Sequence, residues 1–373
     1  MSRADTVASL ISRWREKGDA FVCFREPGAS HCRCIRGGRL EALDGMDRLD
    51  GREGFVFAPF RAGEGHPVWM LRAGEEAGFP ADRIEGGTEK EAPAPVPVAG
   101  RLDVVPSPRY ARAFAAFSRA LCAGEFQKLV LSRRVGEPCP AGFSWAEAFR
   151  AACRRYVHSY VYLFYAPQTG YWLGATPEIL LRGRGGAYET VALAGTQCLK
   201  NGRLAGKWSA KNIREQAFVA DYVADGLRGL GLACSAEGPF TVTAGELAHL
   251  KTVFRFSLPA EVPVGRVLQV LHPTPAVCGL PKEAARRFID AQEGYDRGYY
   301  AGFLGTFDLE GETALYVNLR CMQSAGNGAD FRLYAGGGLL PSSVLEEEWM
   351  ETERKLQTMK YVISKGIPSE IYR

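Results

Sequence analysis

The sequence predicts an α+β protein rather than a doubly wound parallel sheet. A chain of 373 residues, of which 46% are hydrophobic, is long and apolar enough to bury a large core. Long helical runs occur together with short apolar runs that have the spacing of strands. The predicted strands come in adjacent groups and do not alternate regularly with helices, as they would in a parallel sheet.

The first hundred residues are rich in glycine and arginine and contain short apolar runs at 55–60 and 68–71. Turn-forming residues separate these runs, so we predict two strands there. Five prolines then interrupt residues 90–108, where they break helices and remove strand donors. We therefore predict a crossover at 90–108 between an N-terminal region, residues 1–104, and a core, residues 105–373.

A helix should follow this crossover, because Ser107 and Pro108 suit its N-cap and first position and Gly124 suits its end. A strand is predicted directly afterwards, at 128–135. Further strands are predicted at 160–165, 315–321 and 331–335, and further helices at 211–230, 281–292 and 345–360.

Composition narrows the class of partner. The net charge is only +4, with acidic and basic residues interspersed, so nucleic-acid binding is not expected and a small molecule is the better expectation. No stretch has the length of a membrane span, and the N-terminus lacks the apolar segment of a secretory signal. The ten cysteines are scattered, so we expect reduced thiols in the cytoplasm; Cys32 and Cys34 alone are weak evidence for zinc.

Two single residues suggest acid–base chemistry. Alternation along the strand 128–135 puts Lys128, Val130 and Ser132 on one face. If that face is covered, desolvation favours the neutral amine and makes Lys128 a usable general base; the alternative is a strand-end lysine that reaches water. Glu178, flanked by apolar residues after a turn predicted at Gly174 and Pro177, is either a general acid with a raised pKa or a solvent-facing glutamate.

The last predicted helix concentrates charge on one face. Glu348, Glu351 and Lys355 are spaced i, i+3 and i+7, which suits a hard cation but is also typical of a solvated face. Gly336, Gly337 and Gly338 lie just upstream, where backbone amides could approach an anion or form an ordinary turn.

Many motifs in this order make the sequence resemble the chorismate-utilising enzymes, a family that includes isochorismate, salicylate, anthranilate and aminodeoxychorismate synthases. The motifs are KLVLSR at 128–133, GATPEILL at 174–181, ALAGT at 192–196, REQAFVADYV at 214–223, ELAHLKT at 246–252, LHPTPAVCGLP at 271–281, DRGYYAGFLG at 296–305, YVNLR at 316–320 and YAGGGLLPSS at 334–343 followed by EEEWMETERK. The resemblance covers about residues 105–362. It implies large layered antiparallel sheets with helices outside, a central active-site cleft and a variable N-terminal region packed on the core.

The resemblance also implies a magnesium ion and a chorismate site. The positions that match the metal ligands are Glu215 and Glu351, with Glu348 close by. Arg320 matches the residue that pairs with the enolpyruvyl carboxylate of chorismate. The other positions that match the substrate pocket are Gly195, Thr196, His249, Ala276, Tyr300, Gly336, Gly337 and Lys355.

Lys128 indicates which reaction to expect. Family members that add ammonia typically carry glutamine at this position, whereas those that add water carry lysine. The expected activity is therefore isochorismate synthase, an isomerase, with Lys128 as the base for water attack at C2 and Glu178 as the acid for the departing C4 hydroxyl. Salicylate synthases share the lysine, but they commonly have threonine where this sequence has Ala276.

Alternatives remain within and outside the family. Anthranilate or aminodeoxychorismate synthase would need an amidotransferase partner, which we do not expect here, and a non-catalytic chorismate-binding relative is the alternative from another class. Menaquinone biosynthesis is the expected pathway, with siderophore biosynthesis as the other option. Two residues depart from the family pattern: Gln216 stands where the family usually has histidine, and Asn212 where salicylate members have glutamate. Both departures bear on the affinity for the metal rather than on the type of reaction.

Overall fold

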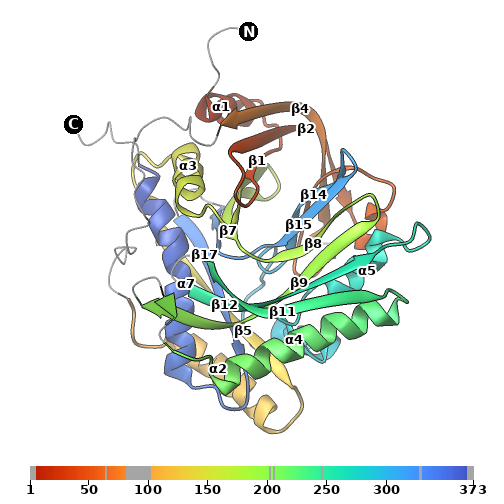
Figure 1. The fold of residues 1–373 in the computed structure, drawn as a ribbon. Helices are drawn as coiled ribbons and strands as arrows, with labels where there is room; N and C mark the ends of the chain where they lie inside the picture. The colour runs from red at the N-terminus through yellow and green to blue at the C-terminus, as the bar shows by residue number, and fades with distance from the viewer. Residues whose placement is uncertain are drawn as a thin grey trace.

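The computed structural model describes residues 6–367 apart from 64, 81–101, 201, 202, 205, 245, 246 and 327–329. Antiparallel pairing joins its seventeen strands into one continuous, strongly bent sheet system, with helices packed outside (Figure 1). This confirms the predicted α+β class with antiparallel sheets.

Four strands come from the N-terminal region: β1 (Phe21–Arg25), β2 (His31–Leu43), β3 (Gly54–Ala58) and β4 (Val68–Pro80). They pair with one another, and two of them also join the rest of the chain. β1 pairs with β6 (Tyr160–Ala166), and β3 pairs with β14 (Phe303–Leu309). The boundary predicted at residue 104 stays a prediction, because most of the proline-rich crossover lies outside the described residues.

The remaining strands complete the sheet. They are β5 (Lys128–Pro138), β7 (Gly170–Thr176), β8 (Ile179–Arg184), β9 (Ala187–Lys200), β10 (Arg203–Leu204), β11 (Cys234–Ala244), β12 (Leu247–Ser257), β13 (Gly279–Leu280), β15 (Glu312–Val317), β16 (Cys321–Ser324) and β17 (Asp330–Leu339). β5 lies between β17 and the short β13, so the first residues of β5 are covered on both edges.

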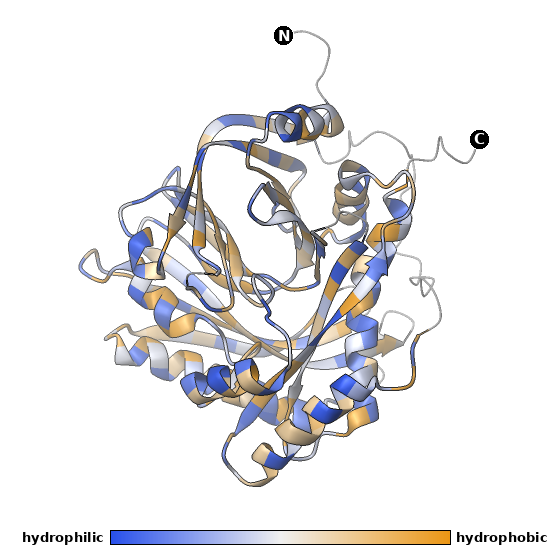
Figure 2. Ribbon diagram, turned by 180° about the vertical axis from the view of Figure 1, so that it is seen from behind, coloured by the Kyte–Doolittle hydropathy of each residue, from blue (hydrophilic) through white to orange (hydrophobic). Residues whose placement is uncertain are grey.

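The helices lie on the outside and present one apolar side to the sheet. They are α1 (Val7–Glu16), α2 (Pro108–Cys122), α3 (Trp145–Arg155), α4 (Ala210–Gly229), α5 (Val264–Leu271), α6 (Lys282–Gln292) and α7 (Leu345–Lys365), with a 3₁₀ turn η1 (Met46–Leu49). α4 packs on β9 and α7 on β17 (Figure 1). Figure 2 shows hydrophilic and hydrophobic residues along the same outer helices, as expected for helices with one buried side.

The helix predicted after the crossover is confirmed as α2: the Ser107 side chain accepts a hydrogen bond from the Tyr110 backbone amide, and Pro108 is its first residue. The strand predicted at 315–321 is not continuous. β15 ends at Val317, and β16 begins at Cys321. Residues 318–320 leave the strand conformation because Asn318 exchanges backbone hydrogen bonds with Ala301 and Gly302.

The turn predicted at Gly174 and Pro177 is wrong for Gly174, which lies inside β7, whereas Pro177 lies in the short connection between β7 and β8. The alternative of an ordinary turn at the three glycines is also wrong: Gly336, Gly337 and Gly338 lie inside β17, where they pair with Ser132, Leu131 and Val130 of β5. Periodicity of apolar side chains cannot reveal a strand at residues that have no side chain.

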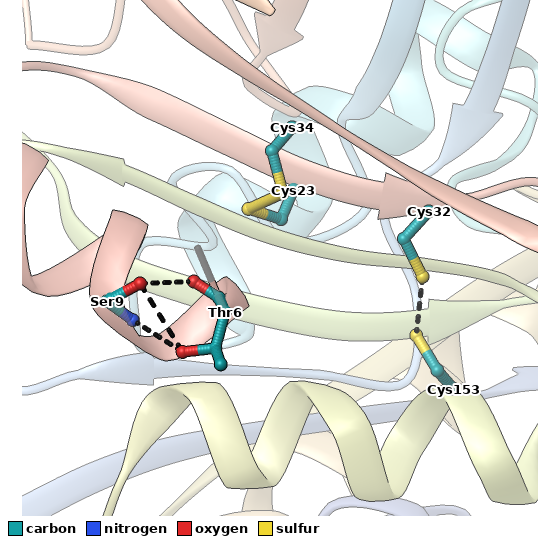
Figure 3. The surroundings of a disulfide bond; sticks show 6 residues. All are labelled: Thr6, Ser9, Cys23, Cys32, Cys34 and Cys153. Carbon is teal, nitrogen blue, oxygen red and sulfur yellow. Dashed lines mark hydrogen bonds between the residues drawn. A yellow bond between two sulfur atoms is a disulfide. The ribbon is translucent and has the colours of Figure 1, made fainter. Parts of the chain in front are cut away.

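The expectation that all ten cysteines are free thiols is wrong for two of them. Cys23 of β1 and Cys34 of β2 lie opposite each other and form a disulfide (Figure 3). Cys32 instead lies 4.0 Å, sulfur to sulfur, from Cys153 of α3, so the structure gives Cys32 and Cys34 different neighbours. Among the described residues no side chains are grouped as a zinc site would require.

In the part of the chain that the structure describes, no helix is both long and apolar enough to cross a membrane.

Candidate active site

One cavity collects twelve of the fourteen predicted site residues. It lies between β9, β12, β17, α4, α7 and the loops at 177–178, 276–277 and 319–320. The predicted residues that line it are Glu178, Gly195, Thr196, Glu215, His249, Ala276, Tyr300, Arg320, Gly336, Gly337, Glu351 and Lys355. Lys128 is buried directly behind this lining, and Glu348 lines the adjoining cleft together with Glu351.

Lys128 has no exposed surface at all. Its Nζ lies 3.0 Å from Glu215 Oε1, although the angles do not make a hydrogen bond and no other described group accepts one from it. Glu215 of α4 and Gly338 of β17 lie against the Lys128 side chain, and Leu280 of β13 pairs with Lys128 at one edge of the strand. The interpretation of Lys128 as a strand-end lysine that reaches water is therefore wrong.

Glu178 is also buried, with 2% of its surface exposed. Thr274 Oγ1 donates a hydrogen bond of 3.2 Å to Glu178 Oε1. Burial raises the pKa of Glu178 to about 7, against the opposing effects of the Thr274 hydrogen bond and of the charges on Lys128 and Lys355. Near neutral pH this carboxyl is therefore available both as a proton donor and as its conjugate base. The interpretation of Glu178 as a solvent-facing glutamate is wrong.

His249 of β12 links the two strands of the pocket wall to Arg320. Its Nδ1 lies 3.1 Å from the Gly195 carbonyl oxygen, and its Nε2 lies 3.2 Å from Arg320 Nη2. Because a guanidinium only donates, Nε2 must accept and Nδ1 must carry the proton. Burial, then Arg320 and Lys355, lower the pKa of His249 well below its ordinary value, so the ring is neutral.

A β-bulge places Gly195 and Thr196 in this wall. In the pairing of β9 with β12, His249 is opposite Thr196 and Leu250 is opposite Ala194, so Gly195 is the extra residue. Its φ of 73° is a conformation that favours glycine.

Arg320 lies in the segment 318–320 between β15 and β16. Its φ is 47°, and its carbonyl oxygen accepts a hydrogen bond from the Ala175 amide. The neighbouring Asn318, fully buried, donates from Nδ2 to the Tyr299 carbonyl and accepts at Oδ1 from the Tyr162 hydroxyl. Asn318 thus fixes the segments that carry Arg320 and Tyr300 against each other.

Three carboxylates lie against Gly337 and Gly338 of β17. Glu215 comes from α4, and Glu348 and Glu351 come from α7; each contacts one lysine, namely Lys128, Lys211 and Lys355 respectively. Burial would raise the pKa of Glu351, but Lys355, Lys211 and Arg320 lower it below its usual range. Burial and the charge of Glu351 raise the pKa of Glu348 to about 7, despite Lys211.

The glycines give these carboxylates room. A Cβ on Gly337 would lie 3.2 Å from Glu351 Oε1 and 3.4 Å from Glu348 Oε2, and a Cβ on Gly338 would lie 2.0 Å from Glu215 Oε1. Glu348 Oε2 is buried without a hydrogen-bond partner in the described part of the chain. Carboxylate oxygens with an unsatisfied acceptor among them fit a hard divalent cation, although the described side chains do not form a cluster of three ligands in this structure.

The two departures from the family pattern have local roles. Gln216 Nε2 donates to the Ala192 carbonyl oxygen and to Thr252 Oγ1, so this side chain points to the sheet and anchors α4 on it. Asn212 Nδ2 donates to the Thr196 carbonyl oxygen. Gln216 is therefore part of the contact between helix and sheet, and Asn212 supports the bulged wall of the pocket.

The sequence patterns did not single out Thr274 or Asn318. Thr274 and Asn318 lie inside the motifs LHPTPAVCGLP and YVNLR, which was the available signal. Their roles depend on contacts with residues distant in the chain, which local patterns do not reveal.

Comparison with known proteins agrees with this geometry. The profile of the family described as "Chorismate binding enzyme" matches residues 81–364. This chain therefore belongs to the chorismate-binding enzyme family.

The isochorismate synthase DhbC of Bacillus subtilis is 32% identical over 252 residues, which cover 63% of this chain and 63% of that relative. The match thus spans less than two thirds of that relative's length. Among solved structures, a putative 2,3-dihydroxybenzoate-specific isochorismate synthase, DhbC from Bacillus anthracis, has a TM-score of 0.75 at 24% identity and covers 95% of this chain and 99% of that chain. MenF, the menaquinone-specific isochorismate synthase of Escherichia coli, has a TM-score of 0.73 at 20% identity, covering 92% of this chain and 88% of that one. These two likenesses establish the fold.

Proposed function

We propose that this protein is a magnesium-dependent isochorismate synthase, an isomerase that converts chorismate to isochorismate. The observation that carries the proposal is that Glu178, with a pKa of about 7, and Lys128 are both buried at a pocket that also holds Arg320 and Lys355. The name of the Bacillus subtilis relative and the family membership support it.

The cationic groups suit a substrate with two carboxylates. Arg320 would pair with the enolpyruvyl carboxylate, and Lys355 lies in the same lining, 2.8 Å from the Gly336 carbonyl oxygen. The neutral His249 keeps one guanidinium nitrogen of Arg320 in place without adding charge. When bound, magnesium held by Glu215 and Glu351, with Glu348 beside them, would neutralise the ring carboxylate.

The chemical step needs one base and one acid. Lys128 takes a proton from a water molecule as the water oxygen bonds to C2 of the ring. The two ring double bonds shift, the C4–O bond breaks, and Glu178 gives its proton to the departing oxygen, which leaves as water. The atoms balance without another reactant, because one water molecule enters and one leaves.

The test is to incubate the purified protein with chorismate and magnesium and to resolve the products by chromatography, with EDTA and ammonium controls. We expect isochorismate that disappears with EDTA. Salicylate plus pyruvate, anthranilate, or no turnover would each contradict the proposal.

A variant of Lys128 tests the base directly. Lys128→Ala should abolish turnover and leave chorismate binding largely intact, measured by calorimetry. Wild-type activity of this variant would disprove the role of Lys128.

A further inference from the structure

A further cavity, of about 430 Å³, adjoins the active site. Its lining includes Trp69, Arg134, Trp172, Tyr299, Arg332 and Tyr334, and we call it the arginine cleft. Tyr334 lines both this cleft and the active-site cavity. Alternation along β5 puts Arg134 on the same face as Lys128, and Arg134 pairs with Tyr334 across the strands. The cleft is thus a neighbouring site on the face that carries the catalytic lysine, and its volume falls within the range of small-molecule sites.

The cleft has an excess of positive charge. Neither Arg134 nor Arg332 has a carboxylate oxygen within 4.0 Å among the described residues. Burial raises the pKa of Tyr334, and the charges of both arginines and a hydrogen bond with Arg134 lower it. The lining includes one carboxylate, Asp296, which lies 2.7 Å from His66; against the raising effect of burial, the Gly298 amide and His66 lower the pKa of Asp296, so it offsets part of the positive charge. The third guanidinium of the lining, Arg297, is already neutralised by Glu293. An anion in this cleft would therefore meet two guanidinium groups that have no carboxylate partner among the described residues.

Aromatic rings form the walls around these charges. Trp172 stacks on Tyr334 at 5.6 Å between ring centroids and meets Tyr299 edge-on at 6.1 Å. The indole Nε1 of Trp172 is buried without a hydrogen-bond partner in the described part of the chain, so this wall also holds an unsatisfied donor. Flat apolar walls favour a planar ring over a flexible aliphatic chain.

We propose that the arginine cleft binds a small aromatic carboxylate, with its carboxylate on Arg134 and Arg332 and its ring against the half-buried Trp69, next to the buried pair Trp172 and Tyr334. Tyr334 also stacks on Tyr300 of the active-site cavity, at 5.2 Å and an interplanar angle of 14°. A ligand in the cleft therefore contacts a side chain that belongs to both sites. The proposal does not depend on the reaction proposed above.

The test is ¹⁹F NMR titration of the full-length protein with 4-fluorobenzoate. We expect saturable binding, and weaker binding of 4-fluorobenzyl alcohol, which keeps the ring but lacks the charge. The double variant Arg134→Gln/Arg332→Gln should lose affinity at least tenfold. Arg228 is an exposed arginine on α4 that does not line the cleft, so Arg228→Gln is the control and should bind as the wild type does.

A third variant separates the two cavities, because benzoate could also pair with Arg320 in the active site. Arg320→Gln should keep the affinity of the wild type. Loss of binding in Arg320→Gln, or wild-type binding in the double variant with an unchanged thermal midpoint, would overturn the proposal.

Discussion

Gly338 should be the most sensitive position of the cavity wall to added volume. In Gly338→Ala the new Cβ would lie 2.0 Å from Glu215 Oε1 and 3.0 Å from Lys128 Cε. Ordinary contact begins at 3.4 Å, so the Glu215 carboxylate must retreat by about 1.4 Å, the difference between these distances. The backbone itself can accept alanine, because the φ of Gly338 is not in the left-handed region.

The retreat displaces Glu215 and its partner Lys128 together, since their contact is 3.0 Å. A misplacement of about 1 Å at a catalytic group costs roughly 10²-fold in rate. Overpacking of this kind destabilises a protein by about 1–3 kcal/mol. We therefore expect kcat to fall about 100-fold while the protein remains folded.

The assay is the initial rate of chorismate consumption, together with urea unfolding of the same preparations. Gly136→Ala is the matched control, because Gly136 lies on β5 with no heavy atom within 4 Å of its added Cβ. The control should keep the wild-type rate and stability within about 0.5 kcal/mol. A wild-type kcat in Gly338→Ala would refute the idea that the glycine makes room for Glu215.

Three further substitutions test other parts of the site. Thr274→Val removes the hydrogen bond that lowers the pKa of Glu178; because the protonated acid is the active form, the fall of kcat/KM above about pH 7 should move to higher pH, and an unmoved pH profile would contradict this role. Glu293→Gln leaves the buried guanidinium of Arg297 without its charge partner, so the free energy of unfolding in urea should fall by about 3–5 kcal/mol. An unchanged urea midpoint would contradict this expectation. Gly195→Ala puts a Cβ at a φ of 73° and 3.0 Å from a backbone oxygen, so the thermal midpoint should fall by the equivalent of about 1–2 kcal/mol, and a rise would show that the bulge is not strained by alanine.

Local signals in the sequence predict those elements whose ends are encoded nearby. Ser107 and Pro108 begin α2 as predicted, and α7 begins at the predicted Leu345. The break at 318–320 has no such local signal, because it depends on hydrogen bonds between Asn318 and residues 301–302. The pairing of β1 with β6 joins residues about 140 positions apart, and no periodicity within either segment indicates the other.

For the site, the sequence predicted which residues belong to it but not the contacts between them. Family motifs placed Glu178 and Arg320 in one pocket, and the structure brings them into one lining. Spacing alone left Lys128 undecided between burial and exposure, because Glu215 and Gly338, which lie against its side chain, are distant in the chain. The ion contact of Lys128 with Glu215 and the hydrogen bond from Thr274 to Glu178 likewise depend on tertiary packing.

The most direct test of water addition is to run the reaction in H₂¹⁸O and to locate the label in the product by mass spectrometry and ¹³C NMR. If a solvent water attacks C2 while the C4 hydroxyl departs, isochorismate will carry one ¹⁸O, in its new hydroxyl group. Isochorismate without ¹⁸O would mean that the original hydroxyl is transferred within the substrate, and it would contradict the roles of Lys128 and Glu178.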